Sequence, residues 1–397
     1  MLFAVLGLLV VLLHYYLWKR LVRDVFTSGR ARLVGTVVLV VLVVCVLATL
    51  TLARVVPPQV GAWFAWPGYI WLALFLYLML ALLVLELVRL ALRPWVRADP
   101  AAAQAEPTTA ETEAEPRKPV VGRRVFLARS AAVVAGVASA TTVGVGMGTA
   151  LGGPQLKRVP VPVGGSALRG YRIAVVSDIH LGPISGRAHT ERIVRAINET
   201  EPDLVAMVGD LADGSVPELG EAAAPLRDLV SREGTFFVTG NHEYYSGHEQ
   251  WITELERLGL HYLRNEHTLV AGDRLTLAGV PDVTGKSFSD APDIPEALRG
   301  RRPELPTVLL AHQPVQVADA AAAGVDLQLS GHTHGGQLWP FHYAVRAAQP
   351  AVSGLSQVDG TWLYVSNGAG FWGPPVRVGA PPDITVVELG GPSQGPS

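Results

Sequence analysis

Five short apolar runs in the C-terminal two thirds of the chain are each followed by side chains that bind metal ions. The runs cover residues 173–176, 204–208, 236–238, 308–311 and 327–329, and the side chains after them are Asp178 and His180, Asp210, Asn241, His312, and His332 and His334. Runs of this length and composition predict β-strands. In an α/β sheet the carboxyl ends of parallel strands share one edge. We therefore expect all seven side chains to meet at one site.

The donor atoms of these seven side chains indicate which cations they bind. Carboxylate and amide oxygens suit hard divalent cations, whereas histidine nitrogen suits manganese, iron and zinc. The set contains no sulfur, and the single cysteine, Cys45, lies in an apolar run near the N-terminus. Asp210 stands between two ligand groups along the chain and is the natural bridging carboxylate. We expect two divalent metal ions (Mn, Fe or Zn) about 3.5–4 Å apart, a spacing that clamps a phosphoryl oxygen.

The order and spacing of these motifs resemble those of the calcineurin-like metallophosphoesterase superfamily over residues 168–390. The matching motifs are Asp178-x-His180, Gly209-Asp210-x-x-Asp213, Gly240-Asn241-His242-Glu243, His312 and Gly331-His332-x-His334. Residues 240–247 and 329–337 are similar to one branch, the membrane-associated YkuE/YaeI-type phosphodiesterases, also called transmembrane proteins with a metallophosphoesterase domain. The resemblance implies an α/β fold, a four-layer α/β/β/α sandwich with its metals at the strand carboxyl ends.

The resemblance also implies a role for each site residue. The metal ligands would be Asp178, His180 and His334 for the first metal, Asn241, His312 and His332 for the second, and Asp210 for both. His242 would protonate the departing alkoxide or steady the phosphoryl oxygens, and Asp213 would fix its tautomer. The reaction implied is hydrolysis of a phosphate ester by a metal-bridged hydroxide. A helix cap for Asp213 and a solvent-facing position for Glu243 stay open as alternatives.

Other residues beside the motifs have less defined roles. Glycines precede three of the predicted ligand segments, where a tight turn or close backbone approach favours a residue without Cβ, and ordinary strand-ending turns are the alternative. These glycines are Gly209, Gly240 and Gly331. Tyr244 and Tyr245 follow the Asn241 motif and are candidates for lining a pocket that takes an apolar or ring-bearing substrate, with core packing as the alternative. His189 matches no ligand position and is expected at the surface or in a loop.

The first third of the chain contains long apolar runs. Residues 33–52 carry no charge, residues 69–85 are nearly as apolar, and residues 2–18 form a shorter run that ends in aromatic residues typical of a membrane interface. About 20 apolar residues cross the roughly 30 Å of hydrocarbon in a bilayer. We expect three transmembrane helices within residues 1–93, with buried core helices as the alternative. A weaker run at 131–151 predicts a fourth membrane helix within residues 123–153.

Two further features concern the topology. Residues 94–122 are rich in Ala, Glu, Thr and Pro and predict a disordered cytoplasmic linker. The linker leads to Gly122-Arg123-Arg124-Val125-Phe126-Leu127, which resembles a twin-arginine export signal at an internal position, with a plain basic flank of a membrane helix as the alternative. Basic residues concentrate between the first and second runs, and again after the third. The positive-inside rule places these segments in the cytoplasm, which predicts a multi-pass protein of the cell membrane with an extracytoplasmic catalytic domain.

Charge and membrane attachment narrow the expected partners. With 32 Lys and Arg against 34 Asp and Glu, the chain shows no basic footprint, so no nucleic-acid partner is expected. A phosphoesterase site attached to the lipid bilayer favours a phosphodiester or pyrophosphate over a monoester. Attachment to the bilayer suggests a lipid-linked ester such as a phospholipid, and the resemblance, because some relatives in the wider superfamily cleave a nucleotide-diphospho-acylglucosamine, implies a UDP-diacylglucosamine-like molecule. Either would place the chain in lipid metabolism, and soluble nucleotides or phosphodiesters at the outer face are as compatible. The alternative is a catalytically silent membrane sensor or scaffold that uses the fold as a binding module, which the intact ligand set disfavours.

Overall fold

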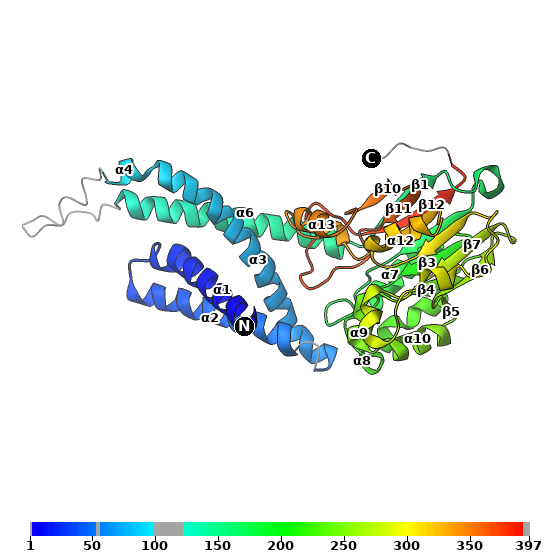
Figure 1. The fold of residues 1–397 in the computed structure, drawn as a ribbon. Coiled ribbons are helices and arrows are strands. Elements are labelled where there is room, and N and C mark those ends of the chain that lie inside the picture. Colours follow the sequence, from blue (N-terminus) through cyan, green and yellow to red (C-terminus); the bar gives the residue numbers. More distant parts are fainter. Residues whose placement is uncertain (1, 53–55, 98–121, 392–397) are drawn as a thin grey trace, which may run out of the picture. The chain divides into compact units, whose positions relative to one another are not determined.

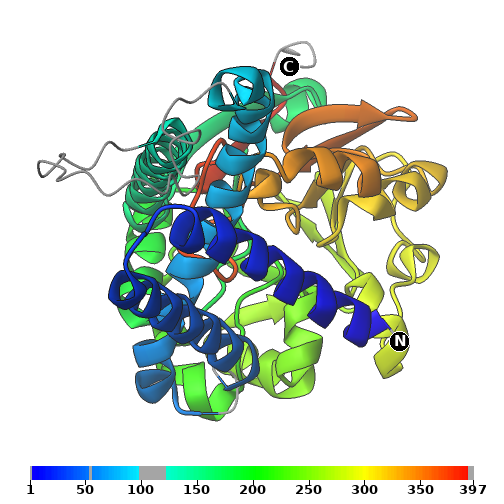
Figure 2. The same ribbon diagram turned by 90° about the vertical axis from the view of Figure 1, so that its left-hand side faces the viewer.

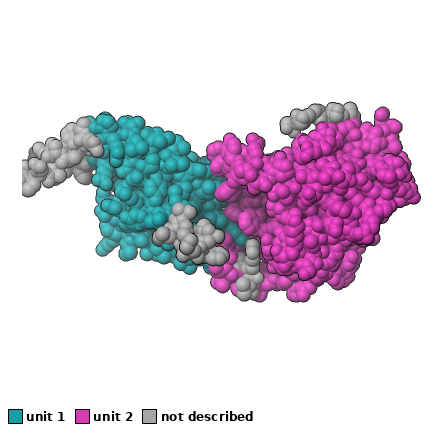
Figure 3. All heavy atoms as spheres, in the orientation of Figure 1, with its two compact units in different colours: residues 1–48, 67–144 teal, residues 49–66, 145–397 magenta. Residues whose placement is uncertain are grey.

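The computed structural model describes residues 2–52, 56–97 and 122–391, which fall into two compact units (Figures 1 and 3). Unit 1 comprises residues 1–48 and 67–144, and unit 2 comprises residues 49–66 and 145–397. Most of the predicted linker, from residue 98 to residue 121, lies outside the described residues. Its first residues belong to a short helix, α4 (Arg93–Arg97).

Long apolar helices make up unit 1. Helix α1 (Leu2–Leu17) continues into a π-helical turn (Trp18–Arg23) and is followed by α2 (Gly29–Leu52), α3 (Pro58–Ala91) and α6 (Arg123–Leu151). Among the described residues, α2, α3 and α6 are long and apolar enough to cross a membrane. A small core formed by Leu17, Trp71, Leu78, Leu82 and Ala135 packs these helices together. Large apolar side chains such as Val40, Leu83 and Val137 stay exposed, as lipid-facing side chains do.

Two six-stranded sheets form the centre of unit 2 (Figures 1 and 2). The first sheet has the order β1 (Gln155–Val161), β12 (Asp383–Leu389), β2 (Arg172–Val176), β3 (Leu204–Val208), β4 (Thr235–Val238) and β5 (Leu260–Tyr262). The second has the order β10 (Gly354–Val358), β11 (Thr361–Val365), β9 (Leu327–Ser330), β8 (Thr307–Leu310), β7 (Leu275–Gly279) and β6 (Glu266–Val270). Strands β2 to β5 are parallel, as are β7, β8, β9 and β11.

The alternation of side chains along the strands builds the layers, because successive residues point to opposite faces of a sheet. Ile173 of β2 and Leu277 of β7 belong to one apolar cluster that both sheets share. On the other face, Ala174 of β2 belongs to a second apolar cluster, which includes residues of helices α7 (Arg187–Asn198) and α10 (His248–Arg257). On the other face of the second sheet, Leu309 joins α11 (Ile294–Ala297) and α12 (Val317–Ala322). These layers confirm the predicted α/β/β/α sandwich.

The last residues of α6, from 145 on, belong to unit 2. The backbone N–H of Arg377 donates a hydrogen bond of 2.9 Å to the carbonyl of Gly146. A Cβ on Gly146 would lie 2.6 Å from Cγ1 of Val376 and 2.9 Å from Cγ2 of Val378. The helix end therefore packs directly on the segment that holds Arg377, and the contact needs a glycine.

Candidate metal centre

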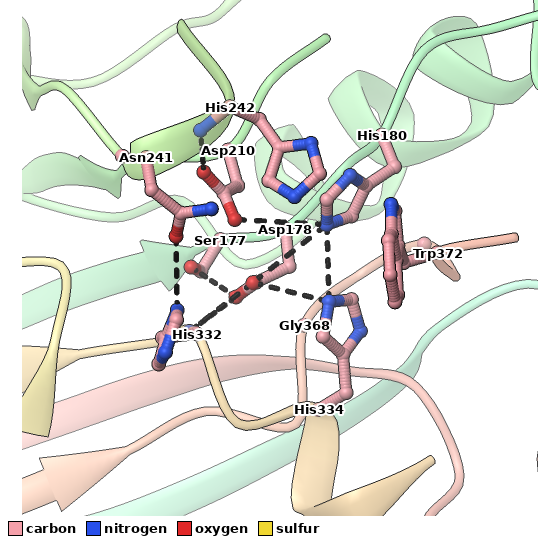
Figure 4. A network of polar contacts seen from close by, with 12 residues as sticks. Ser177, Asp178, His180, Asp210, Asn241, His242, His332, His334, Gly368 and Trp372 are labelled. Atoms are coloured by element: carbon pink, nitrogen blue, oxygen red, sulfur yellow. Dashed lines mark hydrogen bonds and ion pairs between the residues drawn. The ribbon is translucent and has the colours of Figure 1, made fainter. Parts of the chain in front are cut away.

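The structure brings all seven predicted ligands together where strands of both sheets end. Asp178 and His180 follow β2, Asp210 follows β3, Asn241 begins helix α9 (Asn241–Ser246) after β4, His312 follows β8, and His332 and His334 follow β9. Figure 4 shows most of these side chains turned toward one another. The seven residues are spread over more than a hundred positions of the chain. They become neighbours only when the sandwich folds.

One group of side chains contains Asp178, His180 and His334, whose ligand atoms lie within 4.8 Å of one another. His334 Nε2 lies 3.3 Å from Asp178 Oδ1 and 3.0 Å from His180 Nε2. All three residues are buried. The two ring nitrogens and the carboxylate thus converge on a single point.

A second group contains Asp210, His312 and His332, again within 4.8 Å. His312 Nε2 lies 3.1 Å from Asp210 Oδ2, and His332 Nδ1 lies 3.0 Å from Asn241 Oδ1. Asp210 Oδ2 is also 3.8 Å from His180 Nε2 of the first group. Asp210, a member of the second group, therefore also lies next to the first.

Backbone strain accompanies this convergence. Five of the predicted ligands have φ in the left-handed region, between 48° and 72°: Asp178, His180, Asp210, His332 and His334. This conformation is uncommon for residues with a Cβ and persists where the surrounding structure compensates for it. Gly209 has φ of 87°, and a Cβ there would lie 2.8 Å from His312 Nδ1. The glycine before Asp210 therefore allows the backbone to pass close to the His312 ring.

Asp213 sets the orientation of two histidines. Its Oδ1 accepts from His242 Nδ1 at 2.5 Å and lies 3.3 Å from His180 Nδ1. A carboxylate only accepts, so both rings carry a proton on Nδ1 and leave Nε2 for other partners. Asp213 therefore holds the tautomer of His242, and no helix begins at Asp213 within the described residues.

The donor set suits divalent cations. His312 Nδ1 donates to the carbonyl of Val208 at 2.7 Å, and its buried Nε2 faces Asp210 Oδ2 at 3.1 Å. In the neutral ring that Nε2 carries a lone pair. Two lone pairs at this distance repel each other unless a proton or a cation lies between them. A site of carboxylate, amide and imidazole donors is typical of manganese, iron or zinc.

The carboxylates of the site also stabilise positive charge on the neighbouring histidines. Burial opposes protonation of His180, but Asp213 and then Asp210 and Asp178 outweigh it and raise its pKa to about 9. Burial likewise opposes protonation of His312, yet the Asp210 carboxylate raises its pKa well above the ordinary value. Bound cations would supply the same positive charge.

Glu243, the last residue of the Gly240–Glu243 motif, has a structural role that the sequence did not assign. It is buried, with 3% of its surface exposed. Its carboxylate accepts from the backbone N–H groups of Asp210 at 2.9 Å and of Gly240 at 2.6 Å. The alternative of a solvent-facing glutamate is therefore wrong. Glu243 joins the loop after β3 to the loop after β4, a contact that depends on the pairing of these strands.

Arg377 is a second supporting residue; its segment, residues 373–377, also resembles the membrane-associated branch of the family, but the sequence assigned it no role. It is buried, and Nη1 donates to the carbonyl of His334 at 2.7 Å while Nη2 lies 3.1 Å from His334 Nδ1. Burial lowers its pKa to about 10, so the guanidinium stays charged near neutral pH. Because a guanidinium only donates, a neutral His334 carries its proton on Nε2, and a cation bound there would displace it. No local sequence pattern links these residues.

The side chains around the site correct two expectations. Tyr244 is buried and its hydroxyl donates to Asp290 Oδ2 at 2.7 Å, so it packs in the core, whereas Tyr245 is 61% exposed. The ring centroids of Tyr245 and Trp372 lie 5.9 and 5.8 Å from the centroid of the His242 ring. His189 lies buried in α7, so its expected surface position is wrong. It shares the core-facing side of that helix with Ile193, four residues later.

Comparisons with known proteins show which family the chain is similar to. The model of the calcineurin-like phosphoesterase family matches residues 171–336. The chain is 39% identical over 262 residues to a transmembrane protein with metallophosphoesterase domain from Bos taurus, covering 62% of this chain and 59% of that protein. It is 35% identical over 224 residues to a metallophosphoesterase of Aquifex aeolicus, covering 55% of this chain and 85% of that protein. It is 30% identical over 230 residues to the metallophosphoesterase YkuE of Bacillus subtilis, covering 55% of this chain and 79% of that protein.

The chain therefore belongs to the calcineurin-like metallophosphoesterase family, which confirms the resemblance read from the motifs. The family uses divalent metals, and the clusters described above are candidate metal ligands in this chain. The chain spans about three fifths of the length of the bovine relative. Membership supports a phosphoesterase hydrolase, and the apolar helices support membrane association.

Proposed function

We propose that this chain is a membrane-anchored phosphoesterase that hydrolyses a phosphodiester or pyrophosphate at a dinuclear metal centre. The observation that carries the proposal is the pair of side-chain groups that meet at Asp210, which belongs to the second and lies 3.8 Å from His180 of the first. In this proposal Asp178, His180 and His334 hold one cation. Asn241, His312 and His332 hold the other, and Asp210 binds both.

The chain's own residues supply positioning and proton transfer. Two divalent cations bound at the centre would provide an activated water nucleophile and offset the charge of the phosphoryl oxygens. His242 donates through Nδ1 to Asp213, and in its doubly protonated form it delivers the Nε2 proton to the leaving oxygen, which leaves the ring neutral with its proton on Nδ1. Asp213 keeps the ring in this orientation, and Glu243 holds the Asp210 loop.

A subsite for the leaving group lies beside His242. A cavity of about 280 Å³ is lined by residues that include His242, Asp213 and Tyr245. Tyr245 and Trp372, which is 50% exposed, present two aromatic rings next to the imidazole. Aromatic surfaces favour a leaving group with a ring or an apolar body, so we propose such an ester, including a lipid-linked one.

The membrane arrangement belongs to the same proposal. Helices α2, α3 and α6 would cross the bilayer, with α1 and its π-helical turn as a further span, and residues 168–390 would form an extracytoplasmic catalytic domain. The support is the length and composition of the helices together with the distribution of basic residues. A reporter enzyme fused after the C-terminus tests the orientation, and a cytoplasmic reading would overturn it.

Hydrolysis by the full chain tests the catalytic proposal. Detergent-purified protein is stripped of metal, reloaded with manganese, and assayed with bis(p-nitrophenyl) phosphate and p-nitrophenyl phosphate. We expect metal-dependent turnover that prefers the diester and falls by about 10²–10⁴-fold in His242→Ala. His261→Ala, an exposed histidine of β5 away from the site, is the matched control and keeps the activity. Equal activity in His242→Ala and the control would refute the role of His242, and no turnover by the folded, metal-loaded chain would favour a binding module.

A further inference from the structure

A cavity of about 670 Å³ lies within unit 1, and three separate segments of the chain line it. These are the π-helical turn after α1, the second half of α3 with α4, and the start of α6. The basic side chains in its lining are Lys19, Arg20, Arg23, Arg89, Arg93 and Arg124. None of them is a predicted metal ligand. The cavity is therefore a separate feature from the metal centre.

The two acidic side chains of the lining already have partners. Arg20 pairs with Asp24 at 3.0 Å and with Glu86 at 2.7 Å. Arg89 Nη1 lies 3.6 Å from Asp24 Oδ2, and the hydroxyl of Tyr16 donates to Glu86 at 3.0 Å. Two arginines thus balance the two carboxylates.

Four positive charges of the lining are left over. Lys19, Arg23, Arg93 and Arg124 have no ion pair or side-chain hydrogen bond within the described parts of the chain. They come from three different segments, so flanking charge at the end of one membrane helix does not account for their meeting at one cavity. A basic cluster without partners among the described residues suits an anion with several negative oxygens, such as a phosphate group.

The remaining walls of the cavity are apolar. Leu82 and Leu85 of α3 and Leu127 and Val134 of α6 line it beside the charges. Both helices are long and apolar enough to cross a membrane. A free phosphate gains nothing from such walls, whereas a phospholipid places acyl chains on apolar helix surface and its headgroup among the basic residues.

We propose that this cavity binds the phosphate headgroup of an anionic membrane phospholipid, with the acyl chains against α3 and α6. The site does not depend on the proposed hydrolase activity, because its lining residues all belong to unit 1. It is a lipid-binding site additional to the metal centre.

Lipid binding by the full chain tests this proposal. Protein purified in a neutral detergent is titrated with phosphatidylglycerol or phosphatidylcholine, and native mass spectrometry counts the retained lipid. Phosphatidylglycerol should bind more tightly than phosphatidylcholine. Arg124→Gln should weaken phosphatidylglycerol binding about fivefold, and Arg23→Gln combined with Arg124→Gln about 25-fold, the contribution expected of basic side chains at a membrane surface. The matched control is Arg30→Gln, an exposed arginine of α2 that does not line the cavity, which should bind as the unaltered chain does.

Three results would overturn the proposal. Equal binding of the two lipids would show that the headgroup charge is not recognised. Equal losses in Arg30→Gln and Arg124→Gln would show that binding follows the general surface charge of the chain. Complete displacement of phosphatidylglycerol by millimolar inorganic phosphate would show a site for a small free anion.

Discussion

Glu243 holds two loops of the metal centre, and its replacement by glutamine tests that role. Its Oε2 accepts from the backbone N–H groups of Asp210 and Gly240, at 2.9 and 2.6 Å. Its Oε1 accepts from those of Leu211 and Ala212, at 2.7 and 3.4 Å. Glutamine keeps the shape of the side chain but replaces one of these oxygens by an NH₂ group, which donates and cannot accept.

The magnitude follows from the number of backbone groups that lose an acceptor. Whichever way the amide is turned, two buried N–H groups face the NH₂ group. Each buried donor left without an acceptor costs about 1–3 kcal/mol, so the variant should lose about 2–6 kcal/mol of unfolding free energy. At roughly 2–4 °C per kcal/mol for a domain of this size, the Tm should fall by at least about 4 °C.

Thermal unfolding of the full chain in detergent and metal-free buffer measures this loss. Glu256→Gln, at an exposed glutamate of α10, is the matched control and should shift the Tm by no more than about 2 °C, since surface substitutions stay near 0.5 kcal/mol. A Tm for Glu243→Gln equal to that of the control would refute the account of Glu243 as the clamp between the loops.

Three further predictions concern other parts of the chain. A Cβ on Gly146 would lie 2.6 Å from Val376, whereas a Cβ on Gly148 would have no neighbour within 4 Å. Gly146→Ala should therefore lose about 1–3 kcal/mol of unfolding free energy. Gly148→Ala, the control, should lose none, and thermal unfolding measures both. Burial and then Arg192 lower the pKa of His189 to about 4. Between its ordinary pKa and pH 4 only the unfolded state binds the proton, so the free energy of unfolding decreases as the pH is lowered, by up to about 3 kcal/mol. The Tm gap between the unaltered chain and His189→Gln should accordingly narrow from pH 7 to pH 4, and a constant gap would contradict this. Tyr245→Ala should raise KM for bis(p-nitrophenyl) phosphate about two- to tenfold, the range of an aromatic contact, with little change for dimethyl phosphate; equal effects on both esters would rule out an aromatic subsite.

The positions of the strands and of the clustered side chains follow from local sequence. The run before Asp178 is apolar at every position, because β2 is buried on both faces between the second sheet and α7. Such runs are recognisable without knowing the fold. The polar residues that interrupt them therefore mark the strand ends, and parallel strands bring those ends together.

The supporting contacts follow from the order of the strands, which local patterns do not contain. Glu243 reaches Asp210 only because β3 and β4 are neighbours in the sheet. Arg377 reaches His334 across a long stretch of chain that includes two strands. Tyr244 and Tyr245 are adjacent in sequence, yet one turns into the core and the other to solvent. In the same way, the basic residues of unit 1 are visible in the sequence, but their meeting around one cavity depends on how the helices pack.

The most direct test of the central claim is metal content measured together with turnover on one sample of the full chain. After stripping and reloading with manganese, elemental analysis should find two ions per chain, and hydrolysis of bis(p-nitrophenyl) phosphate should rise as the second site fills. Asp210→Asn should hold fewer than two ions and lose turnover, because Asp210 belongs to one group of side chains and lies next to the other. Full activity in the stripped chain or in Asp210→Asn, or a single ion in the active protein, would contradict a dinuclear metallophosphoesterase.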